Sequence, residues 1–382
     1  MLVLALSAGL ARSAETTTPA PAAPPVSAPD ATLAALEARI AALEAQLTAA
    51  QQSDLLKEAE ALASPTTASA APPPARATFN AMNPGITAFG DVVGQVGLGP
   101  DGVSPGSTMY LRAVELQFRA DVDPFAKADL VLAFEQEAPP LDGGPGEGFG
   151  AEPEEAYIEL VALPARLSAK VGKFKAPFGV INRTHTHDLP WIDGPNLMGD
   201  EGYNDTGGTL TWLLPLGPAG VTVTGGAFAG EPFDPDNAVA NLAALGRAEL
   251  FVGTGDVGAS VGGSVLQNVG GDGRYLGGDF TLRWKPSQRR SLVLMSELVS
   301  GETLGGYAAL QYQPARLWYV GVRQDFGADG LKSNVYLSTY SSEFLRVRIG
   351  GGYAHDIGAV DLLSQLTFVW GSHPVEPWWV NR

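Results

Sequence analysis

Two histidines and a carboxylate stand close together in one short segment of the chain, at His185, His187 and Asp188, just after Arg183. Imidazole and carboxylate groups at this spacing could hold a divalent metal ion in an extended loop. The segment has no third defined ligand, and the same groups would also serve to fix a loop to a neighbouring surface. From the sequence we therefore expect no cofactor and no metal, with His185, His187 and Asp188 as the candidates if a metal is bound.

Enzymatic chemistry is not expected. A hydrolase needs a serine or acidic nucleophile held beside a histidine. The chain has four histidines, and none stands in a convincing set of catalytic partners. His355 and His373 are isolated, which favours structural roles for both.

Two pairs of basic residues are spaced by two, Lys173 with Lys175 and Arg346 with Arg348. Residues at this spacing share one face of a strand, so each pair could line a water-filled channel. Charges inside a channel act on passing ions, although any water-filled barrel also carries solvated charge on its wall. We expect both pairs to line a pore, as candidates for an anion track, but acidic loops act in the opposite sense and leave the selectivity open.

The element that would position these side chains is a strand with two unlike faces. In residues 279–285, Phe280, Leu282 and Trp284 alternate with polar or charged residues. Side chains along a strand alternate between faces, so one face meets an apolar medium and the other carries charge. The pattern recurs from about 86 to 370, and much of the apolar face is aromatic, which predicts a transmembrane barrel with lipid outside and water inside.

Composition supports this fold class. The chain has 382 residues, a net charge of -17 and no cysteine. It contains no apolar run of about 18 residues, so a spanning structure would have to be a closed barrel. The absence of cysteine fits export through an oxidising compartment. The negative charge argues against a nucleic-acid partner, which needs a basic surface.

Turn residues divide the barrel region into about sixteen antiparallel strands, each expected to have 9–11 residues. Tight turns, such as those near 123–126 and 163–166, alternate with long connections at 139–153, 179–207 and 230–244. Outer-membrane barrels have short periplasmic turns and long external loops. We therefore expect both termini on the periplasmic side.

The region before the barrel has its own organisation. It reads as a signal peptide (1–14, with an incomplete basic start), a Pro/Ala-rich linker (15–29), a coiled-coil helix (30–62) and a second Pro/Ala-rich linker (63–82), ahead of the barrel (83–382). The helix has apolar residues at alternating spacings of three and four, which is coiled-coil patterning, at Leu33, Leu36, Ile40, Leu43 and Leu47. A solitary amphipathic helix is the alternative.

Two segments of the chain form a recognisable pair, Glu154-Glu155-Ala156-Tyr157-Ile158 and then Gly172-Lys173-Phe174-Lys175-Ala176-Pro177-Phe178-Gly179. They resemble the phosphate-selective porin O and P family and related porin-like outer-membrane proteins. The resemblance covers about 110–210 and implies a sixteen-stranded trimeric channel with a third loop folded inward. Phosphate binders of the family carry basic residues at the constriction. Here residues 180–206 have only Arg183 against five acidic residues, which puts phosphate selectivity in doubt.

These observations favour an outer-membrane porin for passive diffusion of small ions or solutes. We expect the loop 180–206 to form the constriction, because Trp191, Ile192, Leu197 and Met198 are too apolar for a loop in water. Arg183, His185, His187 and Asp188 would then face the pore. The expected partners are outer-membrane lipid and lipopolysaccharide, two further copies in a homotrimer, and peptidoglycan. The alternative function is a tether to the cell wall through the coiled coil.

Overall fold

The computed structural model describes residues 84–100, 102–136, 140, 148–198, 202–233, 242–287 and 289–371. The expected signal peptide, both linkers and the coiled-coil helix (1–82) lie outside the described residues. Within the described residues, no helix is long and apolar enough to cross a membrane.

The described chain forms one antiparallel sheet whose strands follow each other around a closed ring. The strands are β1 (Gly85–Gly99), β2 (Gly102–Val103), β3 (Thr108–Asp123), β4 (Ala126–Glu135), β5 (Gly150–Leu163), β6 (Leu167–Lys175), β7 (Asn204–Leu216), β8 (Ala219–Phe228), β9 (Ala243–Thr254), β10 (Val257–Asn268), β11 (Arg274–Ser287), β12 (Arg290–Ser300), β13 (Leu304–Ala315), β14 (Trp318–Gly327), β15 (Gly330–Ser342), β16 (Leu345–Ala354) and β17 (Ala359–Gly371). Three single-turn 3₁₀ segments also occur: η1 (Pro164–Arg166), η2 (Thr186–Asp188) and η3 (Glu231–Phe233).

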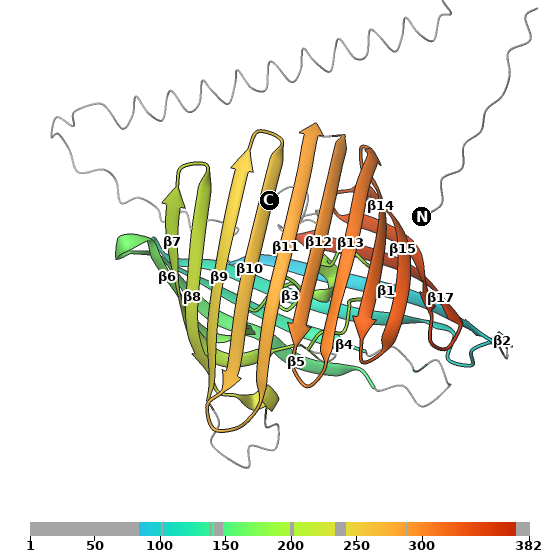
Figure 1. Ribbon diagram of the computed structural model, residues 1–382, viewed down its shortest axis with the longest axis horizontal. Helices are drawn as coiled ribbons and strands as arrows, with labels where there is room; N and C mark the ends of the chain where they lie inside the picture. Colours follow the sequence, from blue (N-terminus) through green and yellow to red (C-terminus); the bar gives the residue numbers. More distant parts are fainter. Residues whose placement is uncertain are drawn as a thin grey trace, which may run out of the picture. The chain divides into compact units, whose positions relative to one another are not determined.

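Closure of the ring comes from the pairing of the first and last strands. β1 pairs with β17 from Thr87↔Gly371 to Leu98↔Val360. The sheet has seventeen strands, and β2 is a two-residue segment in the connection between β1 and β3, so sixteen strands make the wall. Figure 1 shows β7 to β13 side by side in one wall, with β3, β4 and β5 crossing behind them. The expected closed antiparallel barrel of about sixteen strands is confirmed.

The alternating pattern accounts for the wall. In β11, Leu282 and Trp284 are exposed outward, whereas Asp279 is 3% exposed inside the barrel. The same outward apolar face continues around the ring, for example at Val322 and Ile349. An apolar exterior with ladder hydrogen bonds satisfied all round is the arrangement that lets a β-structure sit in lipid.

The two rims differ in the length of their connections, as the sequence predicts. The connections on the rim where β1 begins and β17 ends are all short, from the one after β3 to the one after β15. The opposite rim carries the long connections after β4, β6 and β8. The wall strands range from nine residues in β6 to sixteen in β3, and many of them are longer than the expected 9–11 residues. A tilted strand of 9–11 residues already spans the hydrocarbon, so the longer strands extend beyond it.

Candidate functional site

The connection between β6 and β7, residues 176–203, turns into the barrel, and we call it the inner loop. In Figure 1 it lies between the near and far walls, directly after β6. Its two ends are tied together by Asn182, whose Nδ2 donates to the Ala176 carbonyl at 2.8 Å and to the Tyr203 carbonyl at 3.1 Å. The Tyr203 amide donates back to Asn182 Oδ1. The loop therefore enters and leaves the lumen as one fixed turn.

The start of the inner loop is fixed to the opposite wall. The amides of Val180 and Ile181 donate to Glu297 Oε2 on β12, at 3.2 and 3.1 Å. The preceding amide, of Gly179, donates to Ser264 Oγ on β10 at 3.1 Å. Gly179 has φ +57, and an added Cβ would lie 1.6 Å from a Glu297 oxygen. Only glycine fits this position.

An apolar anchor holds the middle of the inner loop. Trp191 and Ile192 are each 1% exposed and pack in a cluster with residues of β1, β12, β13, β14, β15 and β17. The Trp191 ring meets the Tyr307 ring edge to face, with centroids 5.2 Å apart, and the Arg323 guanidinium lies 4.7 Å from the Trp191 ring centroid. The expectation that these apolar loop residues fold against the wall is confirmed.

Main-chain carbonyl groups of the inner loop are bound by arginines of the wall. The four pairs are Arg112 with Ile192, Arg323 with Asp193, Arg346 with His187, and Arg348 with Trp191. Buried carbonyl groups need donors, and charged donors make the stronger hydrogen bonds. These four carbonyl groups of the loop are thus satisfied inside the lumen by side chains of the wall.

Asp193 adds an ionic anchor at the far end of the loop. It forms ion pairs with Arg323 and with Lys332 (3.0 Å), and it accepts a hydrogen bond from the Tyr336 hydroxyl. Burial opposes ionisation of this carboxyl, but the charges of Arg323 and Lys332 outweigh burial and lower the pKa of Asp193 to about 2. The carboxylate therefore remains charged, and the loop remains anchored, over the physiological pH range.

The two histidines of the inner loop lie against carboxylates of β3 and β5. His185 Nδ1 lies 3.2 Å from Glu154 Oε2, and its Nε2 lies 3.1 Å from Glu155 Oε2. His187 Nδ1 lies 2.8 Å from Glu115 Oε1. Burial alone would lower the pKa of His185, but the carboxylates outweigh it and raise that pKa well above the ordinary value. The pKa of His187 is raised in the same way, mainly by Glu115 against the effect of burial.

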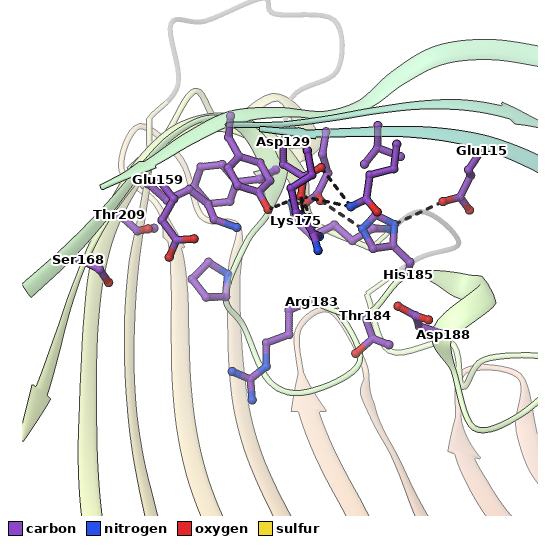
Figure 2. Close-up of a pocket in the computed structure, with 18 of the residues that line it drawn as sticks. Glu115, Asp129, Glu159, Ser168, Lys175, Arg183, Thr184, His185, Asp188 and Thr209 are labelled. Atoms are coloured by element: carbon purple, nitrogen blue, oxygen red, sulfur yellow. Dashed lines mark hydrogen bonds and ion pairs between the residues drawn. The ribbon is translucent and has the colours of Figure 1, made fainter. Parts of the chain in front are cut away.

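Between the inner loop and the wall from β3 to β7 lies a cavity of about 660 Å³. Figure 2 shows Arg183, Thr184 and Asp188 on the loop, with Glu159, Ser168 and Thr209 on the wall. The lining also includes Glu115, Asp129, Lys170 and Lys175. This is a polar space of mixed charge that a hydrated ion or a small solute can enter.

Much of the charge in this cavity is paired. Arg119 contacts Asp129 at 2.9 Å, and Arg183 contacts Glu249 at 3.4 Å. The Lys170 ammonium lies 3.7 Å from the centre of the Tyr157 ring. Arg119 and Arg183 are also the cations with large exposed fractions, at 54% and 38%, so they are the ones within reach of a passing ion.

The residues predicted for the pore separate into three groups. Five of the eight line the cavity: Lys175, Arg183, His185, His187 and Asp188. Arg346 and Arg348 face the lumen but are 1% and 0% exposed, because the inner loop covers them. They hold the loop and do not form a track with the lysines.

Lys173 requires a correction, because it lies on the outer face. It pairs across the ladder with Ala156, and the next outward pair is Val171 with Ile158. Its neighbour Phe174 is 1% exposed and packs inside the barrel against Phe228. An aromatic residue can face the lumen here because the inner loop makes part of the lumen apolar.

The contacts between the histidines and the wall carboxylates cannot be predicted from the sequence. Glu115, Glu154 and Glu155 stand at least 30 positions away in the sequence, and only the inward fold of the loop brings them together. The sequence also contains a motif that in some hydrolases surrounds a serine nucleophile. The run from Gly258 to Gly262 reads Gly-x-Ser-x-Gly, but it lies within the regular strand β10 and not at the strand-to-helix turn that exposes a nucleophile.

Comparison with known proteins gives few sequence relatives. No protein-family model matches the chain. An uncharacterized protein of Aquifex aeolicus (strain VF5) is 29% identical over 109 residues, which is 28% of this chain. The chain thus matches only about a fifth (21%) of the length of that curated relative.

Solved structures share the fold. The high-pH structure of Pseudomonas putida OprB matches 75% of this chain and 94% of its own, with 12% identity and a TM-score of 0.52. Salmonella typhi OmpF, in its complex with daunomycin, matches 75% of this chain and 97% of its own, with 10% identity and a TM-score of 0.50. Both are outer-membrane barrels of the porin kind. The chain therefore has the fold of a transmembrane porin-type barrel.

The apolar anchor makes Trp191 the residue on which docking of the inner loop depends most. We expect Trp191→Ala to destabilise the docked loop by about 3–5 kcal/mol, the usual loss for a buried tryptophan. Hydrogen exchange of the amides in 179–198 should then speed up while the ladder amides stay protected. Trp212→Ala, which removes an outward-facing ring, is the matched control. Unchanged exchange in the Trp191 variant would show that the anchor lies elsewhere.

Proposed function

We propose that this protein is an outer-membrane channel for passive diffusion of small ions and polar solutes, with the inner loop as its constriction. The observation that carries the proposal is the polar cavity left between the inner loop and the β3–β7 wall. On its other side the loop is bound to β10, β12 and the strands beyond them. Passage through the barrel would therefore follow the cavity.

The cavity suits transport better than retention of a single ligand. Its walls carry carboxylates, guanidinium groups and hydroxyls. These groups can replace the water molecules around many different solutes, and they do not form a binding site that fits a single solute. Since opposite charges are paired there, the field along the path is weak. We infer a channel of low ion selectivity, and phosphate selectivity is not favoured, because Arg183 is already paired with Glu249.

The proposal also covers location and assembly. The apolar exterior fits an outer membrane, with lipid and lipopolysaccharide as its surroundings. The short-turn rim would face the periplasm, and both barrel ends lie on that rim. Association as a homotrimer follows from the family resemblance of residues 110–210, and contact with peptidoglycan would involve residues outside the described part of the chain.

Planar-bilayer recording tests the constriction directly. Deleting residues 186–200 removes the apolar anchor and the covering of Arg346 and Arg348. We expect a folded barrel with higher single-channel conductance than the unaltered protein, because the path is no longer narrowed. A folded variant with unchanged conductance would place the constriction elsewhere, and an unaltered protein that forms no channel would refute the proposed function.

Ion selectivity should respond to Arg183 and not to Lys173. Arg183→Glu puts a carboxylate beside Glu249 at the cavity, so the reversal potential in a salt gradient should shift toward cation preference. Lys173→Glu makes the same charge change on the outer face and is the matched control. The effect should shrink as salt rises, because mobile ions screen exposed charge. An equal shift in both variants would contradict the assigned faces.

The orientation can be tested with single cysteines, since the chain has none. Asp272→Cys lies in the connection between β10 and β11 on the long-loop rim, and Ala165→Cys lies in the turn between β5 and β6 on the other rim. A membrane-impermeant thiol reagent added to intact cells should label the first variant only. Labelling of Ala165→Cys from outside would reverse the proposed orientation.

A further inference from the structure

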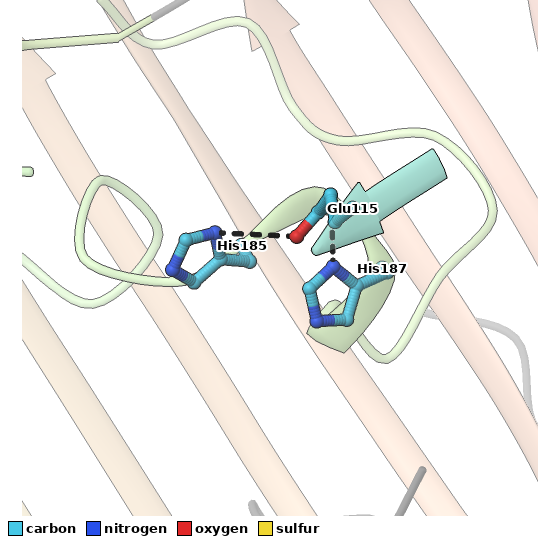
Figure 3. A group of neighbouring side chains, drawn as sticks. All are labelled: Glu115, His185 and His187. Atoms are coloured by element: carbon cyan, nitrogen blue, oxygen red, sulfur yellow. Dashed lines mark hydrogen bonds and ion pairs between the residues drawn. The ribbon is translucent and has the colours of Figure 1, made fainter. Parts of the chain in front are cut away.

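The histidines of the inner loop and the nearest wall carboxylate converge in three dimensions. Figure 3 shows His185 and His187 on either side of Glu115, each with one ring nitrogen directed at its carboxylate. One ligand atom from each of these residues can be chosen so that all lie within 4.8 Å of one another. A second group of this kind joins Glu115 to Glu135 and Glu154, so Glu115 belongs to both groups.

The distances fit a small divalent ion. His187 Nδ1 lies 2.8 Å from Glu115 Oε1, His185 Nδ1 lies 4.0 Å from Glu115 Oε2, and His185 Nδ1 lies 3.2 Å from Glu154 Oε2. Tetrahedral ligands at metal distances of 2.0–2.2 Å are separated by about 3.4 Å. The three observed separations lie on both sides of this value.

The far sides of both rings point to a metal independently of the ligand spacing. His185 directs its other nitrogen, Nε2, at Glu155 Oε2 (3.1 Å), and His187 Nε2 lies 3.6 Å from Asp188 Oδ1. A metal-binding histidine almost always has its second nitrogen oriented by a carboxylate, a carbonyl group or water. Here both imidazoles have Nδ1 on the side of Glu115 and Nε2 on the side of another carboxylate, which is Glu155 for His185 and Asp188 for His187.

The surroundings also hold the rings in place. His187 is 4% exposed and stacks on Phe89 with ring centroids 4.2 Å apart, and the two histidine rings stack on each other at 5.5 Å. Three glutamates lie around the two imidazoles, and Lys175 is bound to one of them, Glu154, at 2.8 Å. A bound divalent cation would add to the positive charge that stabilises these buried carboxylates.

We propose that Glu115, His185 and His187, with Glu154 as the fourth ligand, bind a divalent transition-metal ion of the Zn²⁺ type. Mixed imidazole and carboxylate ligands suit zinc and its neighbours and do not suit Mg²⁺ or Ca²⁺, which take oxygen ligands. The ion would join the inner loop to β3 and β5, next to the Arg346 guanidinium that binds the His187 carbonyl. This site goes beyond the proposed channel and does not depend on it.

Titration of the full-length folded protein with Zn²⁺ alone, after removal of metal by a chelator, tests the site by calorimetry. We expect one ion per chain, unaffected by excess Mg²⁺. Replacing both ligands, His185→Asn with His187→Asn, should abolish this binding. Glu155→Gln, which leaves the ligands in place, should weaken affinity by about 10–100-fold, as for other residues that orient a metal-bound histidine. His355→Ala, which removes a histidine bonded to Ser333 on the rim, is the matched control.

A second measurement needs no variant. Co²⁺ bound to the unaltered protein should give the intense visible absorption of a four-coordinate ion with nitrogen ligands, and Zn²⁺ should displace it. A weak six-coordinate spectrum, binding below one equivalent, or equal Zn²⁺ binding by the double histidine variant would overturn the proposal. In that case the imidazoles serve only as protonated partners of the glutamates.

Discussion

The binding of loop carbonyl groups by wall arginines is the interaction on which the interior of this barrel depends. A loop of irregular structure inside a barrel brings main-chain groups that have no ladder to join, and each buried group without a partner costs about 1–3 kcal/mol. Arg112, Arg323, Arg346 and Arg348 supply the missing donors from β3, β14 and β16. Without them Trp191 and Ile192 could not stay in their apolar cluster.

This arrangement divides the lumen into two unlike halves. Toward β12–β15 the interior is packed like a protein core, with Met295, Tyr307 and Tyr336 around the loop. Toward β3–β7 it is polar and open. The histidines lie at the border, since His187 stacks on Phe89 and also lines the cavity. The electrostatic character of the open half is therefore set by residues whose positions depend on the packed half.

The sequence predicts the wall well and the interior only in part. Period-two alternation at Phe280, Leu282 and Trp284 identifies faces because one side must meet lipid and the other must not. The same rule fails at Lys173 and Phe174, where the loop supplies an apolar surface inside the barrel. The apolar residues Trp191 and Ile192 disclose that the loop folds inward, since exposure to water would be unfavourable. The residues that pack against them, and the pairing of His185 with Glu154, depend on contacts between distant segments. Such contacts produce no pattern in the local sequence.

The separation in sequence between the inner loop and its partners has a consequence for how the molecule assembles. Arg346 is 159 positions from His187, and Lys332 is 139 positions from Asp193. Contacts between segments so far apart form late, because a long stretch of chain must first be ordered. The loop is made early along the chain, yet three of its four arginine donors arrive only with β14 and β16. Until those strands join, Trp191 and Ile192 lack part of the surface that covers them in the finished barrel. Complete docking of the loop therefore requires the C-terminal strands of the barrel.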